Sequence, residues 1–234
     1  MSATVEHLTG HPVDLRRASR VLAAAVLPIG PAAVALLRYL LPYTTAEDSA
    51  SVVRSVAAHQ TAQSVAVWLG FIACLTLVPG VVYAGRMVGR TAPRVAAGAT
   101  VLLVLGYLSL SWLTVADAYV LFGVRHHLPT ATVAAMYDGV HPAASVAAGL
   151  FVLGHVLGTI LLGVGMLRGR VVPTWAAVAT IVAQPVHFVA AVIVSSQTLD
   201  LLGWGLNAVG FAALSFAILR LEDDEWAPAP RPSQ

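Results

Sequence analysis

Three ionisable side chains lie inside or at the edge of long apolar runs of this sequence, where water cannot solvate them. They are Asp117, His155 and His187. Ionisable residues in a membrane span are costly and mark functional sites by default. A carboxylic acid and imidazoles can donate and remove protons in a dry cavity. These three residues are therefore the first candidates for catalysis.

The segment IVAQPVHFVAAV adds a fourth candidate, Gln184, which precedes Pro185. A proline inside a helix removes one backbone donor and can kink the helix. A kink beside Gln184 and His187 would widen a pocket. Alternatively, Gln184 donates to the carbonyl group that the proline leaves free, and the kink serves packing alone. Both interpretations remain open.

Further side chains at similar depths could form the walls of a cavity. Residues three or four apart share one face of a helix, and polar groups on that face should point into a bundle rather than into lipid. On this basis the predicted substrate-binding residues are Tyr107, Trp112, Trp204, Asn207, Trp68 and Phe188.

Six apolar runs are long enough to hold these residues in membrane-spanning helices, which need about 20 mostly apolar residues each. The sequence therefore predicts an all-α, polytopic membrane protein with a bundle of six transmembrane helices. Gly154 and Gly158 predict a close helix contact. The two longer outer loops, 44–60 and 128–142, should be partly helical. The predicted spans are 21–43, 62–85, 95–122, 143–167, 173–196 and 199–221.

Composition agrees with a chain that lies mostly in a lipid bilayer. Of its 234 residues, 58% are hydrophobic and 10% are charged, against about 25% charged in soluble domains. The mean hydropathy is +0.82. A formal charge of +2 without a basic block argues against nucleic-acid binding. We expect a multi-pass protein of the cell membrane.

Arginine predicts the orientation, because short cytoplasmic segments are enriched in basic residues. Ten arginines fall on one side of the predicted spans and three, Arg38, Arg54 and Arg125, on the other. Both termini should therefore be cytoplasmic. Residues 1–20 form the N-terminal segment, 21–221 the transmembrane domain and 222–234 a disordered cytoplasmic tail. The start also resembles a secretory signal with paired arginines, but five later spans favour an uncleaved first helix.

Counting depth along the spans places the polar candidates in the outer half of the bundle. At about 1.5 Å per residue, His155 lies about 18 Å and His187 about 21 Å along their helices. Asp117 either acts as an acid or forms an ion pair with Arg38 or Arg125. The two histidines fit a proton relay, a pair of haem or metal ligands, or core packing. Asp200 is expected to cap the last span.

The stretch LFVLGHVLGTILLGVGMLRGRVVPTWAAVATIVAQPVHF has a recognisable pattern: a glycine-rich span, a short arginine turn, VVPTW, and a second span. It resembles a group of six-span bacterial membrane proteins of unknown function that is common in actinobacteria. The resemblance is mainly in residues 143–221. It implies the six-span fold and no particular activity.

These residues predict an integral membrane enzyme that acts on a hydrophobic, isoprenoid-type substrate, such as a proton-initiated terpene cyclase. Asp117 would protonate the substrate, and His187 or His155, with Gln184, would remove the final proton. Tyr107, Trp112 and Trp204 would stabilise the carbocation. No metal or other cofactor is predicted. The alternatives are a binder or proton-coupled transporter of a lipophilic ligand and, less favoured, a haem-bearing electron carrier.

Overall fold

The computed structural model describes residues 14–139 and 141–227, and it confirms an all-α chain with six helices long and apolar enough to span a membrane. The helix ends differ from the predicted ones by at most five residues, at the first span, which begins at Arg16 rather than residue 21. In the fifth span α7 is followed by a π-helix, η1. The elements are α1 Arg16–Leu40, α3 Gln60–Gly89, α4 Pro93–Arg125, α6 Ala143–Arg168, α7 Thr174–Phe188, η1 Val189–Val194 and α8 Gln197–Leu219.

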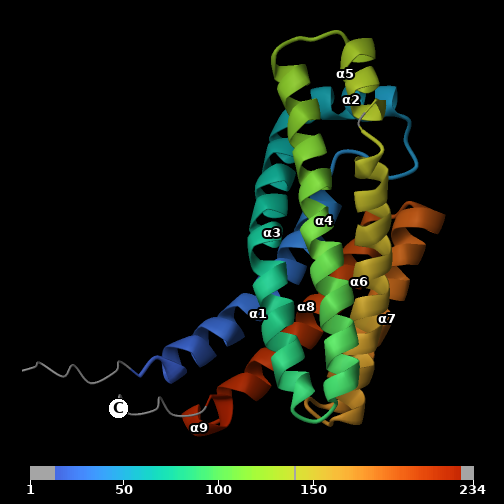
Figure 1. Cartoon of the computed structure of the whole chain (residues 1–234). Coiled ribbons are helices and arrows are strands. Elements are labelled where there is room, and N and C mark those ends of the chain that lie inside the picture. Colours follow the sequence, from blue (N-terminus) through green and yellow to red (C-terminus); the bar gives the residue numbers. More distant parts are fainter. Residues whose placement is uncertain (1–13, 140, 228–234) are drawn as a thin grey trace, which may run out of the picture.

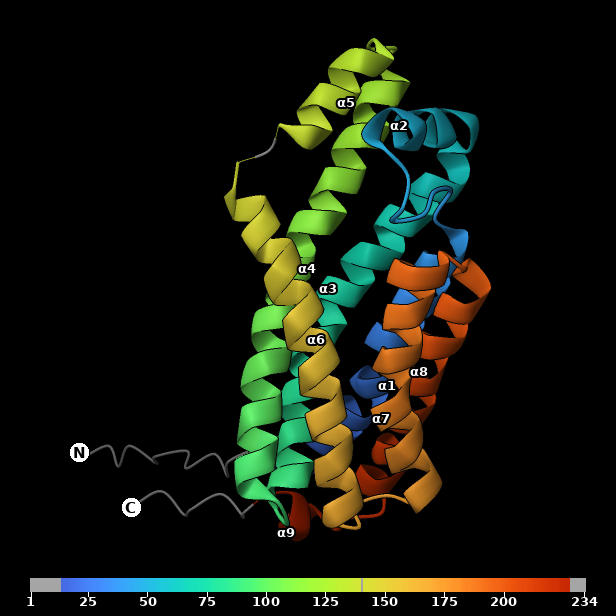
Figure 2. The ribbon, with the colours of Figure 1, turned by 90° about the vertical axis from the view of Figure 1, so that its right-hand side faces the viewer.

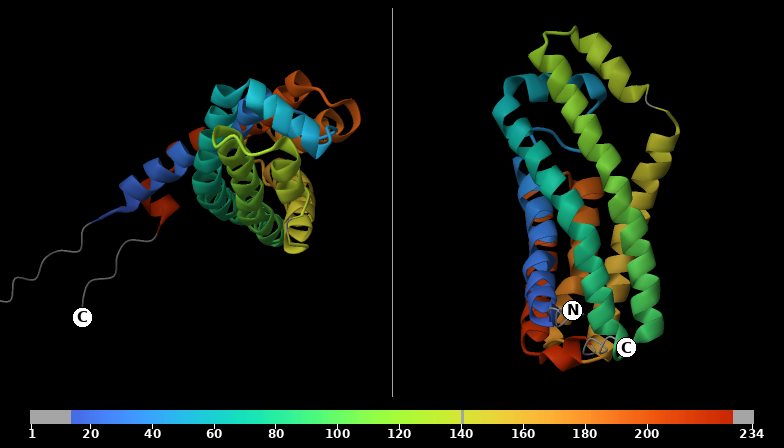
Figure 3. Two further views of the ribbon diagram at one scale, coloured as in Figure 1. Left: turned by 90° about the horizontal axis from the view of Figure 1, so that it is seen from above. Right: turned by 60° about the vertical axis from the view of Figure 1, so that its left-hand side comes forward.

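The six long helices form a closed ring (Figures 1 and 3). In order around the ring, α1 packs against α3, α3 against α4, α4 against α6, α6 against α7, α7 against α8, and α8 against α1 again. Each helix thus has two extensive neighbours. Side chains that point toward the axis of the ring are shielded from lipid. Polar groups in the spans must lie on this inward side.

Two short helices cover one end of the ring, which we call the outer end. α2 (Ser49–Ala58) and α5 (Thr130–Asp138) pack against each other and against α4. α4 has 33 residues and is about 50 Å long, so it extends beyond a hydrocarbon core of about 30 Å. A second apolar cluster, which includes Tyr43, Val53 and Val133, fills this outer cap. The prediction of helical outer loops is confirmed.

Glycines allow α4 and α6 to approach closely, as the predicted glycine pair indicated. A Cβ atom on Gly154 would lie 2.5 Å from the carbonyl oxygen of Leu102 and 2.8 Å from the Cα atom of Gly106. Gly158 faces Leu103 in the same way. Only glycine fits at such a backbone contact, so Gly106 and Gly154 set the distance between the two helices.

Gly154→Ala should therefore lower the free energy of unfolding by about 1–3 kcal/mol, the usual effect of overpacking. Gly149→Ala is the matched control on the same helix, because a Cβ there meets nothing within 4 Å. It should be neutral or slightly stabilising, since alanine favours helix over glycine. Unfolding in mixed detergent micelles measures both variants, and equal effects would contradict the close contact.

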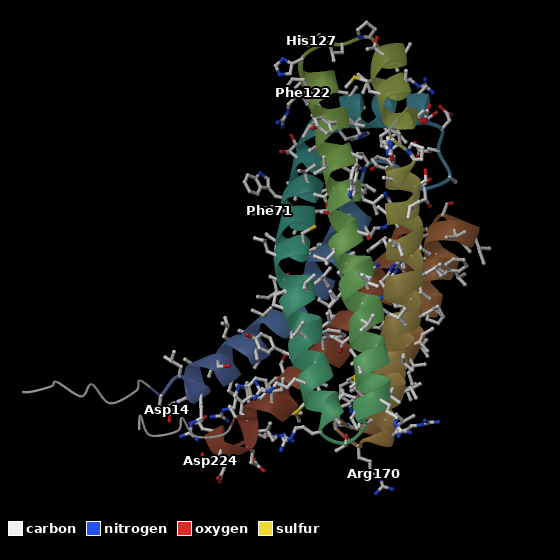
Figure 4. The ribbon with its side chains drawn as sticks, in the orientation of Figure 1. Asp14, Phe71, Phe122, His127, Arg170 and Asp224 are labelled. Carbon is white, nitrogen blue, oxygen red and sulfur yellow. The ribbon has the colours of Figure 1, made fainter. Side chains whose placement is uncertain are left out.

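The inner end of the ring carries most of the arginines. α1 begins and α8 ends there, beside the turns that join α3 to α4 and α6 to α7 (Figure 2). In Figure 4, Asp14, Asp224 and Arg170 lie at this end and His127 at the other. Arg231 is outside the described residues. This separation agrees with the arginine pattern, whereas the side that faces the cytoplasm remains a prediction.

The predicted disordered tail is wrong for its first residues. Asp223–Trp226 forms a short helix, α9, that returns to the bundle. Trp226 is buried, its indole N–H donates to Ser19 Oγ at 3.2 Å, and the Arg86 guanidinium lies 4.4 Å from its ring centroid. The acidic, proline-rich composition suggested disorder. The burial of Trp226 and its cation–π contact instead stabilise a folded segment here. Residues 228–234 lie outside the described part of the chain.

Candidate functional site

A cavity of about 410 Å³ lies toward the outer end of the bundle. Its lining draws on α1, the 41–47 loop, α4, α6, α7 with η1, and α8. In Figure 2 the outer half of α6 stands apart from α7, and the cavity is lined by residues of both. The walls are mainly aliphatic and aromatic. Its charged or titratable lining residues are Arg38, Tyr43, Glu47, Asp117, Tyr137 and His187.

One wall of the cavity contains a buried charge cluster. Arg38 Nε on α1 donates to Asp200 Oδ2 on α8 at 2.6 Å, and His187 Nδ1 on α7 contacts Asp200 Oδ1. Asp200 was predicted to cap its helix, but Ser196 does so, accepting from Leu199 N–H at 3.3 Å. The correction has a physical reason. A carboxylate that is 1% exposed in a membrane protein requires a positive partner, and Arg38 supplies it.

This cluster fixes the tautomer of His187. Arg38 can only donate, so Asp200 acts as an acceptor, and His187 presents its Nδ1–H to the second carboxylate oxygen. The Nε2 of His187 then carries a lone pair. The hydrogen bond recorded for the His187 ring is the one from Nδ1 to Asp200, and His187 lines the cavity. A carboxylate-oriented imidazole of this kind is suited to act as a general base.

A second carboxyl group that matters for proton transfer, Asp117 on α4, also lines the cavity. The Tyr43 hydroxyl donates to Asp117 Oδ1, and Gln63 Nε2 donates to the Asp117 backbone carbonyl at 3.4 Å. Burial, and secondly the Asp117 carboxylate, raise the pKa of Tyr43 well above its usual value, so Tyr43 stays a donor. In the part of the chain described, no ion pair joins Asp117 to Arg38 or Arg125.

Of the ten residues predicted for the site, four line this cavity: Asp117, His187, Phe188 and Trp204. Four others are buried in the bundle and do not line this cavity, so their predicted roles stay predictions. These four are His155, Gln184, Tyr107 and Asn207.

The two remaining residues, Trp68 and Trp112, lie on the outside of the bundle and do not line this cavity. Their side chains are 65% and 48% exposed. Phe71 and Phe122 point outward from α3 and α4 in the same way (Figure 4). Aromatic rings are stable in lipid and at its interface as well as in a protein core, so their depth alone does not indicate where they face.

The two histidines meet across the bundle, which agrees with their predicted depths. Their ring centroids are 5.3 Å apart, and both lie within 5.6 Å of the Trp204 ring. His155 stacks on Phe151 at 4.3 Å. These aromatic neighbours pack directly beside the two imidazoles. Among the described residues, no group of three or more His, Cys, Asp or Glu side chains could hold a metal ion.

The site also includes Arg38 and Tyr43, which were not predicted as site residues. Arg38 carried a usable signal, because an arginine in an apolar span must find a partner. Tyr43 carried none, since its contact with Asp117 joins residues 74 positions apart.

The fold and the site together define a multi-pass, six-helix membrane protein with a lipophilic cavity near one end. The chain matches no family model, no curated protein and no solved structure. The resemblance of residues 143–221 to a bacterial six-span family therefore stays a prediction.

Proposed function

We propose that the protein is an integral membrane enzyme that transfers protons on a small lipophilic substrate, of isoprenoid type, bound in the outer cavity. One observation carries the proposal: Asp117 and the Asp200-oriented imidazole of His187 line the same apolar cavity. A volume of about 410 Å³ suits a small ligand. An acid and a base on one dry cavity are the minimum that proton-initiated cyclisation or isomerisation requires.

In this mechanism Asp117 donates a proton to an alkene or epoxide of the substrate. Its Oδ1 accepts from Tyr43, and the residue lines the cavity in which the ligand would bind. The resulting carbocation is stabilised by the face of Trp204. His187 Nε2 then removes a proton to form the product alkene. One proton enters and one leaves, so the reaction needs no redox partner.

Feeding prenyl alcohols, their diphosphates and epoxides to membranes that contain the protein tests this proposal. Asp117→Asn keeps the shape of the side chain but removes the acid, and should lower product formation about 100-fold. Asp138→Asn is the matched control, because Asp138 lies on the outer cap and bonds Ser49. It should leave the yield unchanged. An unchanged yield with Asp117→Asn would exclude Asp117 as the proton donor.

A binder or proton-coupled carrier of the same ligand is the second candidate. The cavity itself favours ligand binding, but the inner half of the ring is filled by an apolar core that includes Val88, Leu162 and Leu214. A continuous path through both leaflets would have to cross this core. Ligand binding that quenches Trp204 fluorescence without any product would favour a binder over an enzyme.

A further inference from the structure

A second group of polar side chains lies at the axis of the ring, inward of the cavity. Tyr107 on α4, Thr159 on α6, Gln184 on α7 and Asn207 on α8 are each at most 1% exposed. We call these four residues the polar layer. The Tyr107 hydroxyl lies against Thr159 and Asn207. None of the four lines the outer cavity.

His155, His187 and Trp204 are in mutual contact, and we call them the imidazole cluster. Helix direction places the polar layer one turn inward of this cluster. α6 runs inward, and Thr159 follows His155 by four residues. α8 also runs inward, and Asn207 follows Trp204 by three residues. α7 runs outward, and Gln184 precedes His187 by three residues. Three independent helices therefore bring a polar residue to the same level.

The polar layer and its neighbours contain eight buried side-chain atoms without a hydrogen-bond partner among the described residues. Buried polar atoms in folded proteins are almost always paired, with protein or with ordered water. Tyr107 lies close enough to Thr159 and Asn207 to pair with one of them, but the Gln184 amide, His155 Nε2 and Trp204 Nε1, left unpaired at membrane depth, would still cost several kcal/mol. A ligand must satisfy them. The atoms are Tyr107 Oη, Thr159 Oγ1, Gln184 Nε2 and Oε1, Asn207 Nδ2 and Oδ1, His155 Nε2 and Trp204 Nε1.

The balance of donors and acceptors defines the chemistry of this ligand. Gln184, Asn207 and Trp204 each offer an N–H donor, and the two amides each offer an acceptor oxygen. His155 offers a third acceptor, because its Nδ1 must donate to the Phe151 carbonyl at 2.5 Å and leaves Nε2 unprotonated. Three donors, three acceptors and two hydroxyls suit a ligand that both donates and accepts hydrogen bonds. A cation or an anion would leave half of them unpaired.

We propose that the polar layer is an internal hydration site in which ordered water molecules bridge the four helices and donate to His155 Nε2. His187 and Trp204 lie between this site and the cavity, so a lipophilic ligand does not reach it. Water bound there places an exchangeable proton directly behind the imidazole cluster. The hydration site does not depend on the proposed function, because the same buried polar atoms need partners whether or not the outer cavity is catalytic.

Radiolytic hydroxyl footprinting of the wild-type protein in lipid nanodiscs tests the proposal, because radicals form from water beside buried side chains. After correction for intrinsic reactivity, Tyr107, which does not line the outer cavity, should be oxidised severalfold faster than Phe211. Phe211 is the control, since it is equally buried on α8 but carries no polar side-chain atom. Equal rates at both positions would overturn the proposal.

Asn207→Leu gives a second test with opposite signs. If water fills the layer, this variant strips hydrogen-bond partners from the water, so the melting temperature falls. If the layer is dry, it removes two unpaired atoms and the melting temperature rises, which overturns the proposal. Ser215→Ala on the same helix is the control, because its hydroxyl already donates to the Phe211 carbonyl at 3.0 Å. If sodium stabilises the wild type and Asn207→Leu abolishes this effect, a cation rather than water occupies the layer, and the proposal is overturned.

Discussion

Asp200→Asn should change the Nε2 of His187, a residue that lines the cavity, from a hydrogen-bond acceptor to a donor. The rate of the proposed reaction should fall by a factor of about 100 to 10,000. Arg38 can only donate, so it would keep the amide oxygen of the new asparagine. The amide NH2 would then face His187 Nδ1 and force it to accept. The proton would move to Nε2, and the imidazole would present a donor where the wild type presents a base.

Nitrogen-15 NMR of histidine-labelled protein measures this change without knowledge of the substrate. In the wild type the His187 Nδ1 should carry the proton, and in Asp200→Asn the Nε2 should carry it. Asp224→Asn, at the inner end of the bundle, is the control and should alter neither the spectrum nor turnover. A wild-type spectrum with the proton on Nε2 would show that His187 is not held as a base.

Arg38→Met should lower the free energy of unfolding by about 3 kcal/mol, the lower end of the range for breaking a buried ion pair. The change leaves the Asp200 carboxylate, 1% exposed, without its guanidinium. The Arg38 side chain is 19% exposed, which weakens the pair and places the effect at the lower end. Methionine keeps most of the apolar contact, so the loss reports the charge.

Unfolding in mixed detergent micelles measures this loss against Arg54→Met. Arg54 is an exposed arginine whose contact is Ser51 Oγ at 2.8 Å, so its removal should change the stability by less than about 0.5 kcal/mol. Adding Asp200→Asn to Arg38→Met should recover part of the loss, because the unpaired charge is then gone. Equal losses for both arginine variants would mean that Arg38 and Asp200 are not coupled.

Most of the fold could be predicted because lipid imposes simple rules on the chain. A helix needs about 20 apolar residues to cross the core, so the length of the apolar runs gave six spans and their approximate ends. The glycine spacing in α6 predicted its contact with α4. The tail failed because Trp226, a single residue, reverses what the composition around it suggests.

The site could be predicted only where helical spacing determines facing. Gln184 and His187, three residues apart on one face of α7, are both buried, as their spacing predicted. Periodicity within one helix carries no information about which residues meet across helices. Arg38 and Asp200 are 162 positions apart, and the division between cavity and polar layer depends on such contacts.

The ring of helices is closed by its own two ends, because α1 packs along α8 and Arg20 pairs with Asp223 at 3.0 Å. The order of neighbours around the ring therefore does not depend on where the chain begins. Joining the ends of the described chain by a linker and opening the turn between α6 and α7 would give a circular permutant. Every helix would keep both neighbours, so the connectivity of this protein is separable from its architecture.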